Sequence, residues 1–307
     1  MPIATPDPIA PAAASILGQM LDERDLILVT GKGGTGKSTV VAALAELAAR
    51  RRGRALAVEM AAHPRLPALL APGSGVDSLN IDAEKVVKNV LGRLLHLPAL
   101  VGGLLGNRII RLFIRTSPAV REMVMLDELR FLVDERAASG CPVLLDLPAT
   151  GHALSFLDTP RAVRSMLRVG PLAQLAARVE QLLLDQRRTE LVLVALPEEL
   201  PVNETIELAA RAAAQGLGSR TVLVNQVPAA PMPAHDLLFL DAIEQGGDAA
   251  LGRYADAARH ILAGAVEARA QIARLRAAIQ LPVIELPELP AADPRACVAA
   301  LAEILAP

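Results

Sequence analysis

Residues 31–39 read Gly31-Lys32-Gly33-Gly34-Thr35-Gly36-Lys37-Ser38-Thr39, and they lie between an apolar run at 26–29 and an alanine- and leucine-rich helical pattern at 40–49. A glycine-rich turn that joins a strand to a helix is the setting of a phosphate-binding loop. Glycines let backbone N–H groups turn inward around a polyphosphate, and the helix N-terminus adds the positive end of its dipole. The stretch therefore predicts a nucleotide site to which all nine residues contribute.

Two side chains of this loop have the chemistry that a Mg·ATP complex needs. Lys37 is placed to reach the β- and γ-phosphates, and the Ser38 hydroxyl is placed to ligate Mg²⁺. ATP and Mg²⁺ are therefore the expected cofactors.

The lysine that directly follows the first glycine, Lys32, narrows the class of loop. The pattern Lys-Gly-Gly-x-Gly-Lys-Ser/Thr resembles the deviant Walker A motif of the family that contains the arsenite-pump ATPase, the tail-anchored-protein targeting ATPase, the Min and Par ATPases and the nitrogenase iron protein. The resemblance implies a dimer in which Lys32 crosses the interface to the partner's nucleotide. A cation that arrives in this way neutralises charge that develops on the phosphates.

Apolar runs at 26–30, 55–58, 143–146, 191–196, 221–225 and 283–286 are typical of buried strands, and helical patterns separate them. This alternation predicts an α/β fold with a doubly wound, mainly parallel sheet of the P-loop NTPase type. Residues from about 79 to 137 show no strand pattern, so we expect a helical insert between the second and third strands. We expect a flexible N-terminal arm over 1–22, which is rich in proline, and one ATPase domain over 23–307.

Composition excludes several classes of protein. The 307 residues carry a net charge of −2, which argues against a surface built for nucleic acid. The two cysteines, Cys141 and Cys297, lie too far apart in sequence for a zinc motif or a disulfide framework. The chain shows no signal peptide and no window of about 20 apolar residues. A cytoplasmic location and no integral membrane segment are therefore expected.

The strand at 143–146 ends in an acid, Asp146, where a Walker B carboxylate would hold Mg²⁺ through water. A helix N-cap is the alternative role for an aspartate at this position. The following run, Asp-x-Pro-Ala-Thr-Gly-His at 146–152, resembles switch II of the arsenite-pump and tail-anchored targeting ATPases. The resemblance implies that Gly151 is a hinge and leaves His152 either a partner contact or a loop residue bonded to backbone.

Two further residues are assigned to the base by the same resemblance. An asparagine at the end of the fifth strand reads the adenine edge in the family, and Asn225 matches it; an ordinary turn residue is the alternative. Pro287, in the run 286–290 after the last strand, would lie beside the base through its backbone. The segment 196–205 resembles the part of the family that faces the dimer interface, and Asn203 is expected to cap a helix over 204–214.

The segment after the second strand departs from the family. Members commonly have an aspartate there that orients the attacking water, but this chain has Met60 or Ala61 at that position, depending on the alignment. Neither side chain can activate water, so the neighbouring acid, Glu59, is the candidate substitute. A Val-Glu pair at this point resembles the bacterial ArsA-like branch. Catalysis is therefore expected to be slow, to use Glu59, or to need a complex with a complete paralogue.

The expected helical insert is strongly apolar over 91–114, and two methionines, Met123 and Met125, follow. Such helices can form an adaptable groove for a hydrophobic client or a lid packed on the sheet or on a partner. The leading hypothesis is a cytosolic, Mg·ATP-dependent dimeric switch of the ArsA/GET3 type. The dimer would be a homodimer or a heterodimer with a paralogue. Its closure would be coupled to a protein partner, a membrane-protein partner or a hydrophobic client. The alternatives are a hydrolysis-poor regulatory subunit and a Par/Min-type positioning ATPase, which the charge balance disfavours.

Overall fold

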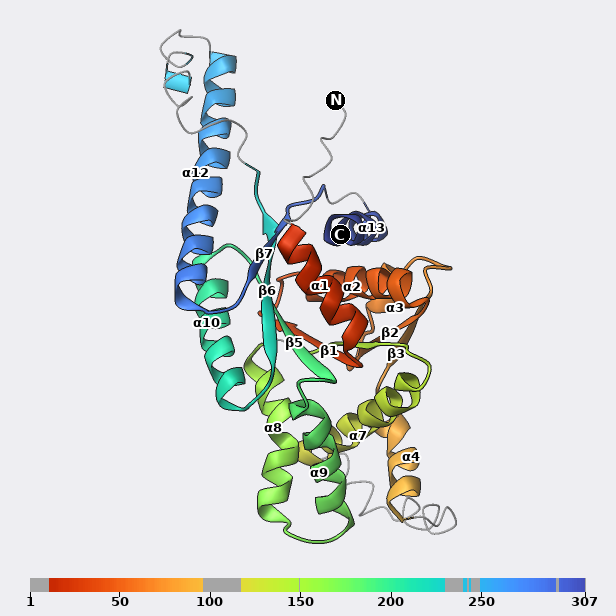
Figure 1. The fold of residues 1–307 in the computed structure, drawn as a ribbon. Helices are drawn as coiled ribbons and strands as arrows, with labels where there is room; N and C mark the ends of the chain where they lie inside the picture. The colour runs from red at the N-terminus through yellow and green to blue at the C-terminus, as the bar shows by residue number, and fades with distance from the viewer. Residues whose placement is uncertain are drawn as a thin grey trace.

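The computed structural model describes residues 11–95, 117–148, 150–229, 240–241, 243, 249–290 and 293–306. Within them, seven parallel strands form one sheet in the order β3-β2-β4-β1-β5-β6-β7 (Figure 1). Their bounds are β1 Leu26–Gly31, β2 Ala55–Glu59, β3 Val76–Asn80, β4 Val143–Asp146, β5 Thr189–Ala195, β6 Ser219–Val227 and β7 Val283–Pro287. The predicted fold class is confirmed.

The central strands are continuous apolar runs because helices cover both of their faces. Every residue of β1, β2 and β5 is buried. Alternate residues of β1 enter two different cores: Leu26 and Leu28 pack on one face of the sheet, and Ile27 and Val29 pack on the other. The sheet therefore holds the loop that follows β1 from both sides.

Helices cover the two faces in separate layers (Figure 1). Helices α1, α2 and α13 contribute to the core on one face, and α7, α8, α9, α10 and α12 contribute to the core on the other. The helix bounds are α1 Pro11–Glu23, α2 Lys37–Arg52, α3 Leu66–Leu69, α4 Ala83–Leu95, α7 Pro118–Ala137, α8 Thr150–Met166, α9 Pro171–Leu184, α10 Glu199–Ala214, α12 Ala249–Ala278 and α13 Pro294–Leu305. No described helix is long and apolar enough to serve as a membrane span.

The structure adds a strand that the sequence did not reveal. Three of the five residues of β3, Val-Asp-Ser-Leu-Asn, are polar and most are exposed, so the strand lacks the apolar run of a buried strand. They form a strand because their backbone pairs in register with the whole of β2 at the edge of the sheet. The predicted insert consequently follows the third strand, not the second, and its start at about residue 79 was placed too early.

The expected flexible arm is wrong over residues 11–22, which belong to helix α1. Pro11 occupies the first position of the helix, where its missing N–H costs no hydrogen bond. Leu17, Met20 and Leu21 are almost wholly buried and belong to the same core as α2. The prolines that suggested an arm at positions 2, 6 and 8 lie outside the described residues.

The described part of the insert consists of helices α4 and α7, which pack against each other. Arg93 of α4 forms ion pairs with Asp127 and Glu128 of α7 at 3.1 and 2.6 Å. In Figure 1 these helices lie with α8 and α9 at the end of the molecule away from the projecting part of α12. Most of the apolar stretch 91–114 lies outside the described residues.

Candidate nucleotide-binding site

The glycine-rich loop lies at the carboxyl edge of the sheet. β1 ends at Gly31 and α2 begins at Lys37, so the intervening residues form the turn between them. β1 is flanked by β4 and β5, whose carboxyl ends border the loop. Ligands of open parallel sheets bind outside the carboxyl ends of the strands. The loop therefore stands where this fold class holds its ligands.

Three glycines give the loop its shape. Gly34 and Gly36 have φ values of 89° and 80°, the left-handed region that residues with a Cβ rarely adopt. A Cβ on Gly31 would overlap the carbonyl oxygen of Val194 in β5, and a Cβ on Gly36 would overlap the side-chain amide of Asn225. The loop is thus a turn that packs closely on the protein beneath it, which fits a cradle of backbone N–H groups.

The side chain of Lys37 turns back into the loop. Its Nζ donates to the carbonyl oxygen of Lys32 at 2.9 Å, and the buried Thr35 hydroxyl donates to the same oxygen at 2.9 Å. Burial lowers the pKa of Lys37, Asp146 acts in the opposite direction, and Arg65 adds to the lowering. A half-buried ammonium beside backbone N–H groups is a site for an anion, and the phosphates of a nucleotide fit it.

Ser38 and Asp146, the two predicted magnesium ligands, lie together. The Ser38 hydroxyl donates to Oδ2 of Asp146 at 2.6 Å. Burial raises the pKa of Asp146, the bond from Ser38 and the charge of Lys37 lower it, and Glu59 raises it further. Among the described residues no group of three metal-ligating side chains gathers. Mg²⁺ in nucleotide sites takes one or two protein oxygens and completes its shell with phosphates and water, so this pair fits it.

Asn225 lies beneath the loop. Its side chain is 5 % exposed, and its Nδ2 donates to the carbonyl oxygen of Thr35 at 2.9 Å. In this structure the amide therefore supports the loop, and the reading of adenine stays a prediction. Pro287 ends β7 and pairs in register with Val227 of β6, so it lies at the same edge of the sheet.

Lys32 leaves the loop in the other direction from Lys37. Its Nζ forms an ion pair with Oε1 of Glu204, on α10, at 2.9 Å. The expected cap at Asn203 is wrong: α10 begins at Glu199, since Pro201 fits the first turn, where its missing N–H has no helical partner. Asn203 instead accepts a hydrogen bond from Arg274 of α12.

Comparison with known proteins gives the family. The model of the CobQ/CobB/MinD/ParA nucleotide-binding domain matches residues 26–124. The chain is 26 % identical over 224 residues to the arsenical pump-driving ATPase of Escherichia coli, which covers 68 % of this chain and 37 % of that protein. It is 31 % identical over 303 residues to ATPase BagA of Mycobacterium tuberculosis, which covers 85 % of this chain and 86 % of the relative. The chain belongs to the ArsA-like P-loop ATPases. It is therefore a nucleotide-binding ATPase of the MinD/ParA/ArsA class.

In this ArsA-like ATPase, Glu59 holds the segment that follows β2. Its side chain is 3 % exposed, and its two oxygens accept bonds from the backbone N–H groups of Arg65 at 2.8 Å and Leu66 at 3.2 Å. The carboxylate thereby anchors the start of α3. The catalytic role of Glu59 stays a prediction.

Two residues near the loop of the ArsA-like ATPase were not predicted from the sequence. Arg65 is exposed, yet its charge acts on both Lys37 and Asp146, which places it beside the site. Gln226 is exposed with a φ of 57°, where the register between β6 and β7 shifts. For Arg65, the sequence offers one signal of a place near the phosphates: it is a basic residue that closely follows the second strand. The strain at Gln226 has no sequence signal.

The predicted switch II of the ArsA-like ATPase begins a helix. α8 begins at Thr150, so Gly151 is helical in this structure and His152 is exposed in the first turn. The preceding Ala149 lies outside the described residues. The hinge role of Gly151 stays a prediction.

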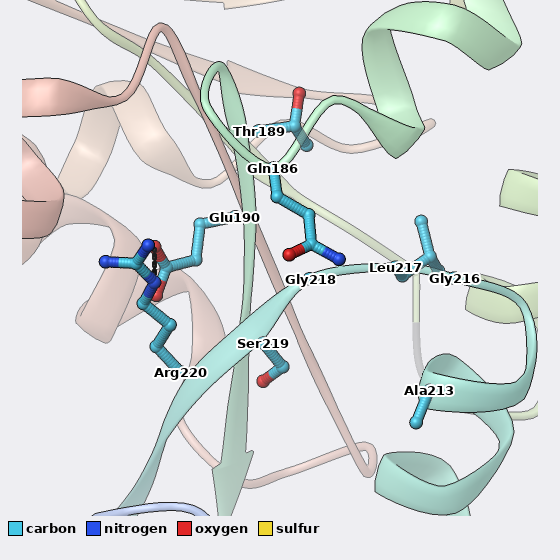
Figure 2. A pocket seen from close by; sticks show the side chains of 9 residues that line it. All are labelled: Gln186, Thr189, Glu190, Ala213, Gly216, Leu217, Gly218, Ser219 and Arg220. Atoms are coloured by element: carbon cyan, nitrogen blue, oxygen red, sulfur yellow. Dashed lines mark ion pairs between the residues drawn. The ribbon is translucent and has the colours of Figure 1, made fainter.

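A cavity of about 240 Å³ lies at the opposite edge of the sheet (Figure 2). It is lined by Thr189 and Glu190 at the start of β5 and by Ser219 and Arg220 at the start of β6. The amino ends of parallel strands are not where this fold class binds its ligands. This cavity is therefore not at the carboxyl ends of the strands, where the nucleotide site of the ArsA-like ATPase is predicted.

Proposed function

We propose that this ATPase is a Mg·ATP-dependent dimeric switch, whose closure around nucleotide is coupled to a protein partner or hydrophobic client. The observation that carries the proposal is the opposite placement of the two loop lysines. Lys37 turns inward to the loop backbone, whereas Lys32 extends outward to α10 and keeps 33 % of its side chain exposed. One lysine can serve the chain's own nucleotide while the other serves a second subunit.

Each of the remaining site residues has a definite part in this proposal. Bound Mg·ATP supplies the phosphoanhydride bond and a cation that neutralises the phosphate charge. Lys37 would bind the phosphates, Ser38 would ligate the metal, and Asp146, whose Oδ2 lies 2.6 Å from the Ser38 hydroxyl, would hold it through water. Asn225 supports the loop at Thr35, and in this proposal it also faces the base. Gly31 to Thr39 supply the backbone cradle.

We propose further that turnover is slow. The family's water-orienting aspartate is replaced by Met60 or Ala61, and neither can take a proton from water. The nearest buried acid on β2, Glu59, is bonded to the backbone of Arg65 and Leu66. General base catalysis contributes about 10²- to 10⁴-fold, so its loss leaves charge stabilisation to do most of the work.

Exposed apolar side chains at the junction of α8 and α9 support the proposal of an apolar client or partner. Met166 ends α8 and is 81 % exposed, and in the following turn Leu167 and Val169 are 41 % and 87 % exposed. Adjacent exposed apolar side chains mark an interaction surface more often than isolated ones do. The sequence predicts either a client groove or a packed lid over residues 91–114, of which the structure describes only 91–95.

The test is the mass of the protein in solution with and without Mg·ATP. The wild type should change from monomer to dimer when nucleotide is added. Lys32→Ala should still bind ATP and stay monomeric, whereas Lys85→Ala, at an exposed position of α4, should behave as the wild type. A Lys32→Ala variant that dimerises normally would refute the assignment of this lysine to a second subunit.

The bonded Glu59 and the replaced aspartate favour a second candidate, a hydrolysis-poor regulatory subunit of a hetero-oligomer. Tight binding of ATP with no turnover by the purified chain, restored on mixing with a paralogue, would support it. Turnover by the chain alone would remove it.

A further inference from the structure

The ion pair between Lys32 and Glu204 joins the nucleotide loop to another element of the fold. Its atoms, Nζ and Oε1, are 2.9 Å apart, and the two side chains are 33 % and 39 % exposed. Lys32 follows β1, whereas Glu204 belongs to α10, which follows β5. The contact therefore depends on the fold and not on neighbourhood in sequence.

Glu204 is held on a rigid support. Its neighbours on α10, Val202 and Thr205, are 0 % and 1 % exposed and fasten the helix to the body. Asn203 accepts a hydrogen bond from Arg274 of the long helix α12. The carboxylate is thus presented to Lys32 by a packed helix, so the position of the lysine is set by α10 while the pair is formed.

A carboxylate and a phosphate compete for the same ammonium. Under the proposed function Lys32 must approach the phosphates of a nucleotide, and it cannot keep a 2.9 Å contact with Glu204 when it reaches across to another subunit. Exposed ion pairs of this kind change an equilibrium constant by about 1.4- to 5-fold, so a multiply charged phosphate group can break this one. The ion pair is strong enough to favour the position of Lys32 beside Glu204, and weak enough to break when Lys32 binds a phosphate group.

We propose that Glu204 is a latch that holds Lys32 on its own subunit in the nucleotide-free state and releases it during closure. This inference rests on the proposed function. It makes Glu204 a positioning residue that acts through Lys32, and it makes α10 and α12 the elements that sense release. Removal of the latch charge should favour the closed dimer, because closure then has one fewer ion pair to break.

The test compares Glu204→Gln with Glu207→Gln, a control one turn further along α10 whose side chain is 71 % exposed and pairs with Arg211. The nucleotide concentration at which half the protein is dimeric, measured by sedimentation with a non-hydrolysable ATP analogue, should fall about 2- to 5-fold in Glu204→Gln and stay unchanged in the control. Lys32→Ala with Glu204→Gln should behave as Lys32→Ala alone. An unchanged or raised midpoint in Glu204→Gln would overturn the latch.

A second measurement separates the latch from the dimer. The chain has four lysines, Lys32, Lys37, Lys85 and Lys88, so labelled lysine side chains give at most four NMR signals to assign. Without nucleotide, the Lys32 signal should differ between wild type and Glu204→Gln; with the analogue, the two should coincide. Coincidence without dimerisation would keep the latch and reject the proposed dimer. A difference that persists with the analogue bound would reject the latch.

Discussion

Gly36 combines a left-handed backbone with a close contact to a neighbouring side chain. Alanine at Gly34 must adopt a left-handed backbone but meets no other atom, so Gly34→Ala should lower the free energy of unfolding by about 1–2 kcal/mol. Gly36→Ala has the same strain and also overlaps the amide of Asn225, so it should cost more and weaken ATP binding. Urea unfolding and nucleotide titration measure both effects.

The double variant Gly36→Ala with Asn225→Ala provides the control. Removal of the amide relieves the overlap, so the double variant should be less destabilised than the sum of the two single variants. Additive costs would mean that the overlap does not exist in solution. Residues in contact commonly show non-additive effects of this kind.

Glu190 should make stability depend on pH. Burial raises the pKa of this carboxyl above its ordinary 4.5, while Arg24 and Arg220 act in the opposite direction. Because the folded protein then holds a proton that the unfolded chain releases, the free energy of unfolding should fall as pH rises from about 4.5 through the raised pKa.

Glu190→Gln removes the titrating group. Urea unfolding between pH 4.5 and 7.5 should therefore show a smaller downward slope in the variant than in the wild type, whatever the change in absolute stability. Equal slopes would show that other groups cause the dependence.

At the scale of elements, α4 is joined to α7 by Arg93. This side chain pairs with Asp127 and Glu128 and lies 4.4 Å from the ring centre of Phe131. Arg93→Met removes one of the cations that face the buried Asp127, whose side chain is 2 % exposed, and leaves its ion pair with Arg130 at 3.0 Å. The free energy of unfolding should fall by about 1–3 kcal/mol, which is the cost of a buried polar group that loses a partner. Urea unfolding measures the change.

Arg211→Met on α10 is the matched control, because that side chain is 49 % exposed and its pair with Glu207 spans 3.8 Å. It should change the free energy of unfolding by less than about 0.5 kcal/mol. Equal effects of the two substitutions would mean that the pairs of Arg93 contribute no more than a surface contact.

The elements that the sequence predicted are those with a local signal. β1, the loop and α2 are contiguous and carry a motif, and the other buried strands are apolar runs. β3 was missed because its pairing with β2 and not its composition makes it a strand. The prediction of an arm over α1 is wrong because proline is also accepted at the first position of a helix, where Pro11 lies.

At the scale of the whole molecule, the site residues too divide into those with a local sequence signal and those whose contacts depend on the fold. Lys37 and Ser38 follow from the motif alone, and Asp146 follows from the end of a predicted strand. The contacts of Lys32 with Glu204 and of Asn225 with Thr35 could not be predicted, because they join segments far apart in the chain. The packing of α10 and α12 around the sheet creates the first of them.

The same arrangement connects the loop to the long helix α12. The loop contacts α10 through Lys32, and α10 contacts α12 through Asn203 and Arg274. α12 runs for 30 residues and projects beyond the sheet in Figure 1. These two polar contacts join the loop to α10 and α10 to α12.

The dependence of ATP turnover on the glycine-rich loop is tested most directly by the release of phosphate from Mg·ATP by the purified chain. Lys37→Ala is measured beside the wild type, with Lys85→Ala as the control. We expect slow turnover by the wild type and by the control. The rate of phosphate release should be about 100-fold lower, or lower still, in Lys37→Ala, because Lys37 is the inward-facing cation of the loop. Equal turnover by wild type and Lys37→Ala would contradict this mechanism, since the reaction would then not depend on this loop.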